Sequence, residues 1–188
     1  SLFYEDVEDI VDRIPIEGGG QAPGNIDSAS AYGGFFDATL LSDEFLWKGG
    51  RADLSLGYMT SKVKDPILGN TRKISGDYYK SYELSLRQDF NETPWAIGAV
   101  IDYSEEAPDV RIDEVGFNNK SRGTLYFFVE HKDVMGLTVK AFAWNLLGAE
   151  NRFRRTVYSD RLADEILFSE RRSRNFGYSY TFVIEGAF

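Results

Sequence analysis

Large apolar side chains fall on every second position in the last stretch of the chain, residues 174–188. They are Phe176, Tyr178, Tyr180, Phe182 and Ile184, and smaller or polar residues separate them. A period of two predicts a β-strand with one apolar face. In water such a terminal strand invites aggregation, because its edge and its apolar face are both exposed. In a membrane barrel the edge pairs with another strand and the apolar face meets lipid.

The same alternation predicts further strands along the chain. They lie at residues 32–40, 51–58, 81–90, 95–103, 124–130 and 137–144. The phase blurs at Phe142 and Trp144, which indicates a bulge or an aromatic rim. A strand at residues 2–16 is extended but carries acidic residues on both faces. We therefore expect an all-β chain, an antiparallel up-and-down meander of about eight strands that forms part of, or closes as, a transmembrane outer-membrane β-barrel.

The expected connections alternate between long and short. Long ones occupy residues 17–30, 61–77, 104–119 and 148–173, and short ones occupy residues 42–50, 91–94 and 132–136. Outer-membrane barrels have short periplasmic turns and longer extracellular loops, whereas soluble β-sandwiches lack this rhythm. With Phe188 on the periplasmic side, the long loops face outward and Ser1 also lies in the periplasm.

Composition narrows the class of protein. Aromatic residues make up 15% of the 188 residues, which favours β-structure, and the net charge of -9 argues against nucleic acid as a partner. Cysteine is absent, so disulfides and thiolate metal sites are excluded. No run of about 18 apolar residues exists, which excludes a transmembrane helix. The first residues lack a signal-peptide pattern, so an exported protein would be represented here by its mature chain or a fragment.

Aromatic residues also gather near the ends of the predicted strands. They are Tyr32, Tyr58, Tyr82, Phe90, Trp95 and Tyr103. These positions fit the aromatic girdles that barrels place at the two membrane surfaces. A plainer interpretation is that aromatic residues are common in strands of any kind.

The chain resembles the C-terminal end of TonB-dependent outer-membrane receptors. The resemblance rests on the segment W-N-L-L-G at residues 144–148, Asn151, Arg152, Tyr158 and the arginine-rich approach to residues 176–180, and upstream on residues 24–29, 32–33 and 49–58. In that family an Asn-Leu pair, here Asn145-Leu146, commonly ends the penultimate strand. The resemblance also marks Tyr180, Phe182 and Phe188 as a membrane-assembly signal, although Gly186 stands where an apolar residue is usual.

The resemblance implies a function in transport. Members of the family carry an N-terminal plug, a TonB box and a barrel of about 22 strands. They import scarce ligands such as iron-siderophores, and about eight strands without a plug imply that residues 1–188 are a single C-terminal barrel segment. The implied location is the outer membrane of a Gram-negative bacterium. The implied partners are outer-membrane lipid, the remaining strands and plug of the receptor, a small-molecule ligand and, through the N-terminal part, TonB.

No sequence motif indicates catalysis. His131 is the only histidine and lies beside a short turn, where a surface role is preferred over a Ser-His-acid triad. Motifs for nucleophilic serine, phosphate loops and zinc proteases are absent. The acids Glu105, Glu106, Asp109, Asp113 and Glu114 fit no EF-hand spacing, so a solvated loop is preferred over a calcium site. We expect no enzymatic activity, no cofactor and no resident metal.

Arginines are concentrated in the last predicted loop. They are Arg152, Arg154, Arg155, Arg161, Arg171, Arg172 and Arg174, and four acids lie among them. Internal salt bridges are the preferred interpretation. The alternative is contact with an anionic ligand or lipopolysaccharide through Arg154, Arg155, Arg171 and Arg172, because guanidinium forks suit phosphate and carboxylate.

Charges on the second faces of the strands also allow two interpretations. They include Asp53, Glu83, Arg87, Asp89 and Lys140, which suit a wet lumen. These residues either form cross-strand ladders that meet a plug or only line water. Two other classes stay open for the whole chain: a self-contained eight-stranded outer-membrane barrel that serves as an anchor or adhesin, and a soluble all-β binding module.

Overall fold

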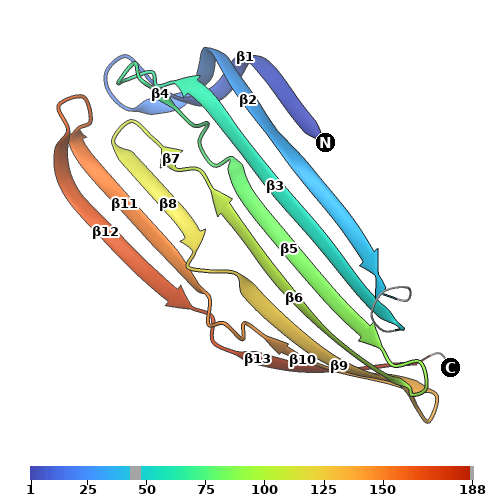
Figure 1. The fold of residues 1–188 in the computed structure, drawn as a ribbon. Coiled ribbons are helices and arrows are strands. Elements are labelled where there is room, and N and C mark those ends of the chain that lie inside the picture. Colours follow the sequence, from blue (N-terminus) through green and yellow to red (C-terminus); the bar gives the residue numbers. More distant parts are fainter. Residues whose placement is uncertain (43–47, 187–188) are drawn as a thin grey trace.

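The chain is all-β. The computed structural model describes residues 1–42 and 48–186, except the side chain of Asp27, and this part forms strands without any α-helix (Figure 1). In the described residues there is accordingly no helix long and apolar enough to cross a membrane. The strands are β1 (Leu2–Pro15), β2 (Gln21–Leu41), β3 (Gly50–Lys64), β4 (Thr71–Arg72), β5 (Tyr78–Asp89), β6 (Trp95–Glu106), β7 (Asp109–Val110), β8 (Glu114–Lys120), β9 (Thr124–Val134), β10 (Leu137–Trp144), β11 (Glu150–Asp160), β12 (Glu165–Asn175) and β13 (Ser179–Glu185).

Antiparallel pairing joins these strands into a meander. A nine-stranded sheet has the order β1-β2-β3-β5-β6-β9-β10-β13, with β4 paired to β3. A four-stranded sheet has the order β12-β11-β8-β7. Its strands prolong those of the first sheet, since β8 leads into β9, β10 into β11 and β12 into β13 (Figure 1). The predicted antiparallel meander of about eight long strands is confirmed.

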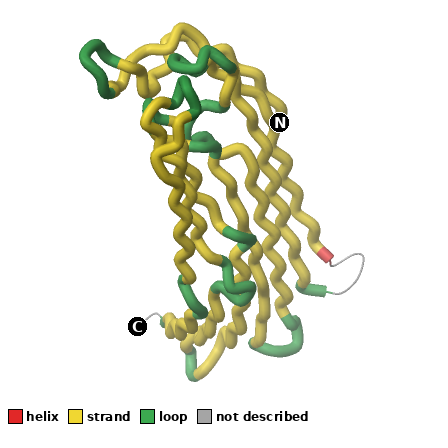
Figure 2. Tube along the Cα trace, turned by 90° about the vertical axis from the view of Figure 1, so that its left-hand side faces the viewer, coloured by secondary structure: helices red, strands yellow, loops and turns green. Residues whose placement is uncertain are grey.

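The molecule is elongated along its strands (Figure 2). We call one end the hairpin end, which carries the connections at residues 16–20, 65–70, 107–113 and 161–164. The opposite end, with the connections at residues 90–94 and 135–136, is called the turn end. The meander is open, because β1 and β13 form the two edges of the larger sheet and are not paired with each other.

One row of cross-strand neighbours defines an apolar face. The residues that pair in register from β2 to β13 are Leu40, Ala52, Leu86, Ala99, Phe127, Ala143 and Tyr180. Every member of the row is apolar or aromatic. Because side chains two positions apart share a face, the row extends along each strand, for example through Phe36, Leu56 and Tyr82. The apolar faces predicted for the separate strands therefore lie side by side as one surface.

Nothing in the described residues covers this apolar face. Phe182 is 77% exposed, Ile184 67% and Leu40 52%. The buried apolar residues are Ala29, Ala31, Val63, Ala96, Ala107, Val110 and Ala149, so none is larger than valine. Sheets in water normally bury their apolar face against a second layer. This chain forms a single layer whose apolar face points away from the rest of the polypeptide.

The expected long loops were wrong, because most of their residues are in strands. β2 begins at Gln21, β3 continues to Lys64 and β6 to Glu106, while β8 occupies part of the expected loop at residues 104–119. The expected loop at residues 148–173 is a hairpin in which β11 pairs with β12. These segments pair through their backbones and carry polar residues on both faces, so no apolar alternation marks them. At the hairpin end, strands therefore occupy most of the sequence that was expected to form loops. The turn at residues 161–164 is no longer than the connection at residues 90–94 at the turn end.

The final strand is shorter than predicted. Asn175 ends β12, pairing is interrupted at residues 176–178, and β13 begins at Ser179. Gly177 has a φ of 70°, and the break between β10 and β11 likewise contains positive φ values, 60° at Asn145 and 64° at Gly148. A residue with left-handed backbone angles changes the direction of the chain. The run β10–β11 is therefore interrupted near Asn145 and the run β12–β13 near Gly177. The predicted phase change near Trp144 lies at the first of these breaks.

Gly98 tests the register between β5, β6 and β9. A Cβ atom there would lie 2.4 Å from the Phe128 ring and 2.6 Å from the Leu86 carbonyl oxygen, so neighbouring groups would have to shift. We expect Gly98→Ala to lower the free energy of unfolding by roughly 1–3 kcal/mol, measured from the urea midpoint of the chain folded in detergent micelles. The control is Gly116→Ala on β8, where a Cβ would meet only ordinary contacts at 3.8–3.9 Å. Equal effects of the two substitutions would contradict this packing.

Candidate functional site

Buried ion pairs connect the hairpins at the hairpin end. Arg72 on β4 contacts Asp12 of β1 through Nη2 and Asp65 through Nε, each at 2.9 Å. Arg161, in the turn between β11 and β12, pairs with the same Asp65. The side chains of Arg161 and Asp65 are only 4% and 2% exposed. We call Asp12, Asp65, Arg72 and Arg161 the hairpin-end network, since it joins β1, the β3–β4 hairpin and the turn between β11 and β12, which are distant in sequence.

Asp65 is the centre of the hairpin-end network. Its Oδ1 atom accepts hydrogen bonds from the amides of Ile67 and Leu68, both at 2.9 Å. Burial by itself raises the pKa of Asp65, but the Leu68 and Ile67 amides and the Arg161 guanidinium favour the ionised form, so the pKa lies below its ordinary value. Asp65 therefore stays charged and holds two guanidinium groups at neutral pH.

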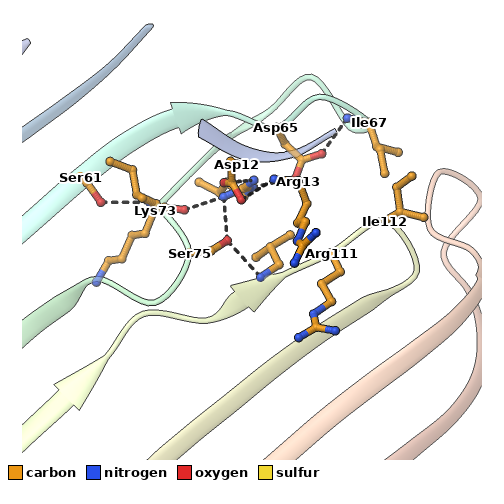
Figure 3. A network of polar contacts seen from close by, with 12 residues as sticks. Asp12, Arg13, Ser61, Asp65, Ile67, Lys73, Ser75, Arg111 and Ile112 are labelled. Carbon is orange, nitrogen blue, oxygen red and sulfur yellow. Dashed lines mark hydrogen bonds and ion pairs between the residues drawn. The ribbon is translucent and has the colours of Figure 1, made fainter. Parts of the chain in front are cut away.

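Hydrogen bonds to backbone groups extend the network to β7 (Figure 3). The Ser75 hydroxyl oxygen accepts from the amide of Val110 at 3.1 Å and from Arg72 Nη1 at 3.3 Å. The Gln21 side chain at the start of β2 accepts from the amide of Ile112 at 3.2 Å. Arg161 also donates to the Arg111 carbonyl oxygen. Arg161 thus bonds the connection at residues 161–164 to those at residues 65–70 and 107–113, and Asp12 and Gln21 attach β1 and β2 to the same group.

The face opposite the apolar one carries a charge ladder. Arg87 on β5 contacts Asp89 at 2.8 Å and Glu130 on β9 at 2.9 Å. Lys140 on β10 lies 3.3 Å from Glu130, and Lys132 pairs with Asp89. A similar group forms nearer β2, where Arg51 and the Thr39 hydroxyl both contact Asp53 at 2.7 Å. Of the two interpretations left open by the sequence, an ion-pair ladder describes Arg87, Asp89 and Lys140, and sequence reasoning did not name its members Glu130 and Lys132.

Aromatic rings continue this polar face toward β13. Phe128 and Phe142 pack at 6.3 Å between centroids, and Trp144 lies 6.1 Å from both Tyr126 and Phe176. The Lys140 ammonium lies 4.4 Å from the centroid of Phe128, a distance at which a cation is attracted to the ring. The surface opposite the apolar face is therefore charged near β5 and aromatic near β10.

Asn145, the first residue of the Asn145-Leu146 pair, is buried between two breaks in the strands. Its side chain is fully buried, donates to the carbonyl oxygens of Ala149 at 3.1 Å and Gly177 at 2.9 Å, and accepts from the Ala149 amide at 2.7 Å. One carboxamide therefore connects the break after β10 to the break after β12. A side chain of this length with both a donor and an acceptor is required to satisfy these backbone groups.

The four candidate arginines lie on two faces of the β11–β12 hairpin. Arg155 contacts Glu170 at 2.7 Å and Glu114 at 3.1 Å, and Arg172 contacts Glu170 at 2.7 Å. The register places Arg154 opposite Arg171 on the other face. Neither has an ion-pair partner among the described residues. The preferred interpretation of internal salt bridges thus describes Arg155 and Arg172, and leaves Arg154 and Arg171 free.

A cavity of about 580 Å³ lies where β6 separates from the β8–β11 pair. Arg152, Arg154 and Phe117 line it from the four-stranded sheet, and Tyr103 and Glu105 line it from β6. Tyr103 belongs to the apolar face, because it pairs with Tyr82 in register and stacks on it at 5.5 Å. The cavity therefore connects Arg152 and Arg154 of β11 with Tyr103 at the hairpin-end border of the apolar face, and Arg171 is the cross-strand neighbour of Arg154.

The acids expected in a solvated loop lie largely in strands or contact cations. Glu105 on β6 is 3.5 Å from Lys80, Glu114 on β8 contacts Arg155, and Asp109 on β7 lies 3.1 Å from Arg111. The solvated-loop interpretation was wrong because these strands show no apolar alternation. Within residues 1–42 and 48–186, no group of three or more His, Cys, Asp or Glu side chains could hold a metal ion.

The remaining sequence candidates lie on β9 and β13 or outside the described residues. His131 on β9 packs edge-on against Trp95 at 4.5 Å, beside the turn between β9 and β10 as expected. Tyr180 and Phe182 lie on the exposed apolar face of β13. Phe188, the third proposed assembly residue, lies outside the described residues.

Comparisons of this chain with protein-family models, curated proteins and solved structures found no match.

The hairpin-end network predicts a local effect of Asp65→Asn. The substitution keeps the shape but leaves Arg161 buried without a counter-charge and Arg72 with Asp12 alone, and breaking a buried pair costs on the order of 3–5 kcal/mol. We expect faster hydrogen exchange at the amides of residues 65–72 and 110–112, with little change in β9 and β10. Asp109→Asn, an exposed partner of Arg111, is the matched control. Equal exchange in the two variants would contradict the network.

The same carboxylate predicts a pH dependence. Because folding lowers the pKa of Asp65 below 3.8, the charge stabilises the fold above that pH, and this stability is lost as the pH falls through the folded-state value. We expect the thermal midpoint to fall on acidification more steeply in the wild type than in Asp65→Asn, measured by circular dichroism between about pH 5 and pH 2. Parallel curves would show that another group is responsible.

Proposed function

We propose that this chain forms part of the wall of an outer-membrane β-barrel, as the C-terminal portion of a TonB-dependent receptor. The observation that carries the proposal is the row from Leu40 to Tyr180, which makes one exposed apolar surface across β2–β13. A polypeptide in water would have to cover this surface. Lipid can cover it without leaving backbone polar groups unsatisfied, since the N–H and C=O groups between neighbouring strands are paired with one another.

The dimensions of the apolar face support this proposal. On β2 the face runs from Tyr32 to Leu40, a length that matches the roughly 9–11 residues with which a strand crosses a bilayer. Tyr82 and Tyr103 stack at its hairpin-end border, while Trp95 and Phe90 lie at the turn end. Aromatic residues at both borders are typical of barrel girdles. The bilayer would then lie between these borders, with the hairpin end in the extracellular space.

The opposite face suits a lumen. The ladder of Arg87, Asp89, Glu130 and Lys140 is partly exposed and carries both signs of charge. Barrel interiors are polar and meet water or a plug. In this proposal the chain contributes lumenal wall and extracellular hairpins to the uptake of a scarce ligand such as an iron-siderophore, and performs no chemistry.

The open edges support a place in a larger barrel. β1 and β13 present unpaired backbone groups along their outer sides, a situation that natural sheets avoid by pairing, covering or charging the edge. In a complete receptor the remaining strands pair with both edges. A self-contained small barrel of the anchor or adhesin type is the second candidate, favoured by the number of long strands, since eight is the smallest common barrel size.

The reading frame upstream of Ser1 separates these two candidates. A receptor predicts further alternating strands, a plug and a TonB box encoded before Ser1. A start codon and signal peptide directly before Ser1 would contradict the receptor and favour the small barrel. Neither outcome depends on how the isolated chain folds.

Leu84 and Ser85 test the orientation toward lipid. They are neighbours on β5, but Leu84 pairs with Leu54 and Ile101 on the apolar face, while Ser85 pairs with Asp53 and Val100 on the polar face. We expect Leu84→Arg to destabilise the folded state in phosphatidylcholine vesicles by about 2–4 kcal/mol and Ser85→Arg to have little effect. Urea titration with protease protection measures both. Equal losses, or a wild-type chain that stays outside the vesicles, would overturn the membrane-wall proposal.

A further inference from the structure

We propose that Arg154 and Arg171, assisted by Arg152, form a binding site for a phosphate group at the hairpin-end border of the apolar face. The two arginines are direct cross-strand neighbours on β11 and β12. Like charges that face each other across a strand pair destabilise it. A bound anion between the two guanidinium groups would convert this repulsion into attraction.

The surroundings of the pair supply donors and little competing charge. On the next rung Thr156 and Ser169 place their hydroxyls 3.4 Å apart on the same face. Glu105, which lines the cavity, lies 3.5 Å from Lys80. Glu150 accepts from the Ser173 hydroxyl at 2.7 Å and lies 3.8 Å from Arg152, whose charge it partly offsets. Guanidinium forks match the oxygens of a phosphate with two parallel hydrogen bonds.

The opposite face of the same hairpin shows the contrast. There Arg155 and Arg172 share Glu170, and Arg155 also contacts Glu114, so their charges are balanced inside the protein. Arg174 lies on this second face too and has no ion pair among the described residues, but its guanidinium lies 5.6 Å from the centroid of the Phe176 ring. Arg154 and Arg171 differ from it in that two unpaired arginines oppose each other directly.

The position of the site favours a phosphate carried by a lipid. Arg152 and Arg154 share their cavity with Tyr103, the apolar-face residue at the hairpin-end border. A lipid whose chains lie along Tyr82 and Leu84 would place its headgroup in this cavity. The lipid-borne source rests on the proposed function, whereas a free phosphate could reach the same guanidinium groups from water.

Matched charge removals on adjacent residues test the site. Arg171→Gln and Arg172→Gln each remove one exposed positive charge from β12, but from opposite faces. The full chain, folded in an uncharged maltoside detergent, is titrated calorimetrically with short-chain phosphatidic acid and, separately, with inorganic pyrophosphate. We expect Arg171→Gln and Arg154→Gln each to weaken binding of phosphatidic acid about tenfold or more, and Arg172→Gln to change it less than about twofold.

The outcomes distinguish the sources and the proposals. Face-selective loss with phosphatidic acid alone supports a lipid headgroup, and the same loss with both probes supports a general phosphate site. Equal losses in Arg171→Gln and Arg172→Gln, or no binding by the wild type, would overturn the site. Circular dichroism confirms that each variant folds. If the chain fails to enter vesicles but binds pyrophosphate face-selectively, the membrane-wall proposal fails while the arginine site stands.

Discussion

The structure depends on one constraint: a single layer of strands has two faces, and only one of them is compatible with water. Register carries this constraint from strand to strand, because a slip of one residue would move every apolar side chain of that strand to the polar face. Leu40, Leu86 and Phe127 therefore lie in one row although long stretches of sequence separate them. In a protein with almost no buried core, pairing between backbones and this shared surface replace interior packing as the source of order.

The polar side of the sheet uses its charges for a different purpose. Arg87, Glu130 and Lys140 come from β5, β9 and β10, and β6 lies between the first two, so their ion pairs bind the sheet across its strands. Partly exposed pairs contribute little singly, but a network with alternating signs opposes register slips. At the hairpin end the same principle operates under burial, where Asp65 unites Arg72 and Arg161. Removing one member there leaves a buried charge, and that penalty makes the hairpins one cooperative unit.

Sequence reasoning found the strands that have two different faces and missed those that do not. Residues 95–103 alternate because one face is apolar, and β6 forms there as expected. β11 and β12 carry polar residues on both faces, so they were interpreted as a loop although they pair along their whole length. The ion pair of Asp65 with Arg161 was equally out of reach, since partners far apart in sequence leave no local pattern. The division of the arginines into two faces could have been suspected from their adjacency, Arg154 beside Arg155 and Arg171 beside Arg172, because adjacent residues in a strand point to opposite sides.

The two breaks near Asn145 and Gly177 separate the nine-stranded sheet from the four-stranded sheet. The strands of the four-stranded sheet carry polar residues on both faces, whereas those of the nine-stranded sheet share one apolar face, so the change in structure coincides with a change in the pattern of side chains. Asn145 bonds both breaks to each other, and backbone pairing holds β11 and β12 in register beyond them. Positive φ at Asn145 and Gly177 lets the chain leave the nine-stranded sheet. The order of neighbours is kept, since β8, β11 and β12 follow one another as β9, β10 and β13 do. The arginine pair lies immediately beyond this junction, and its place beside the apolar border is therefore a consequence of where the strands break.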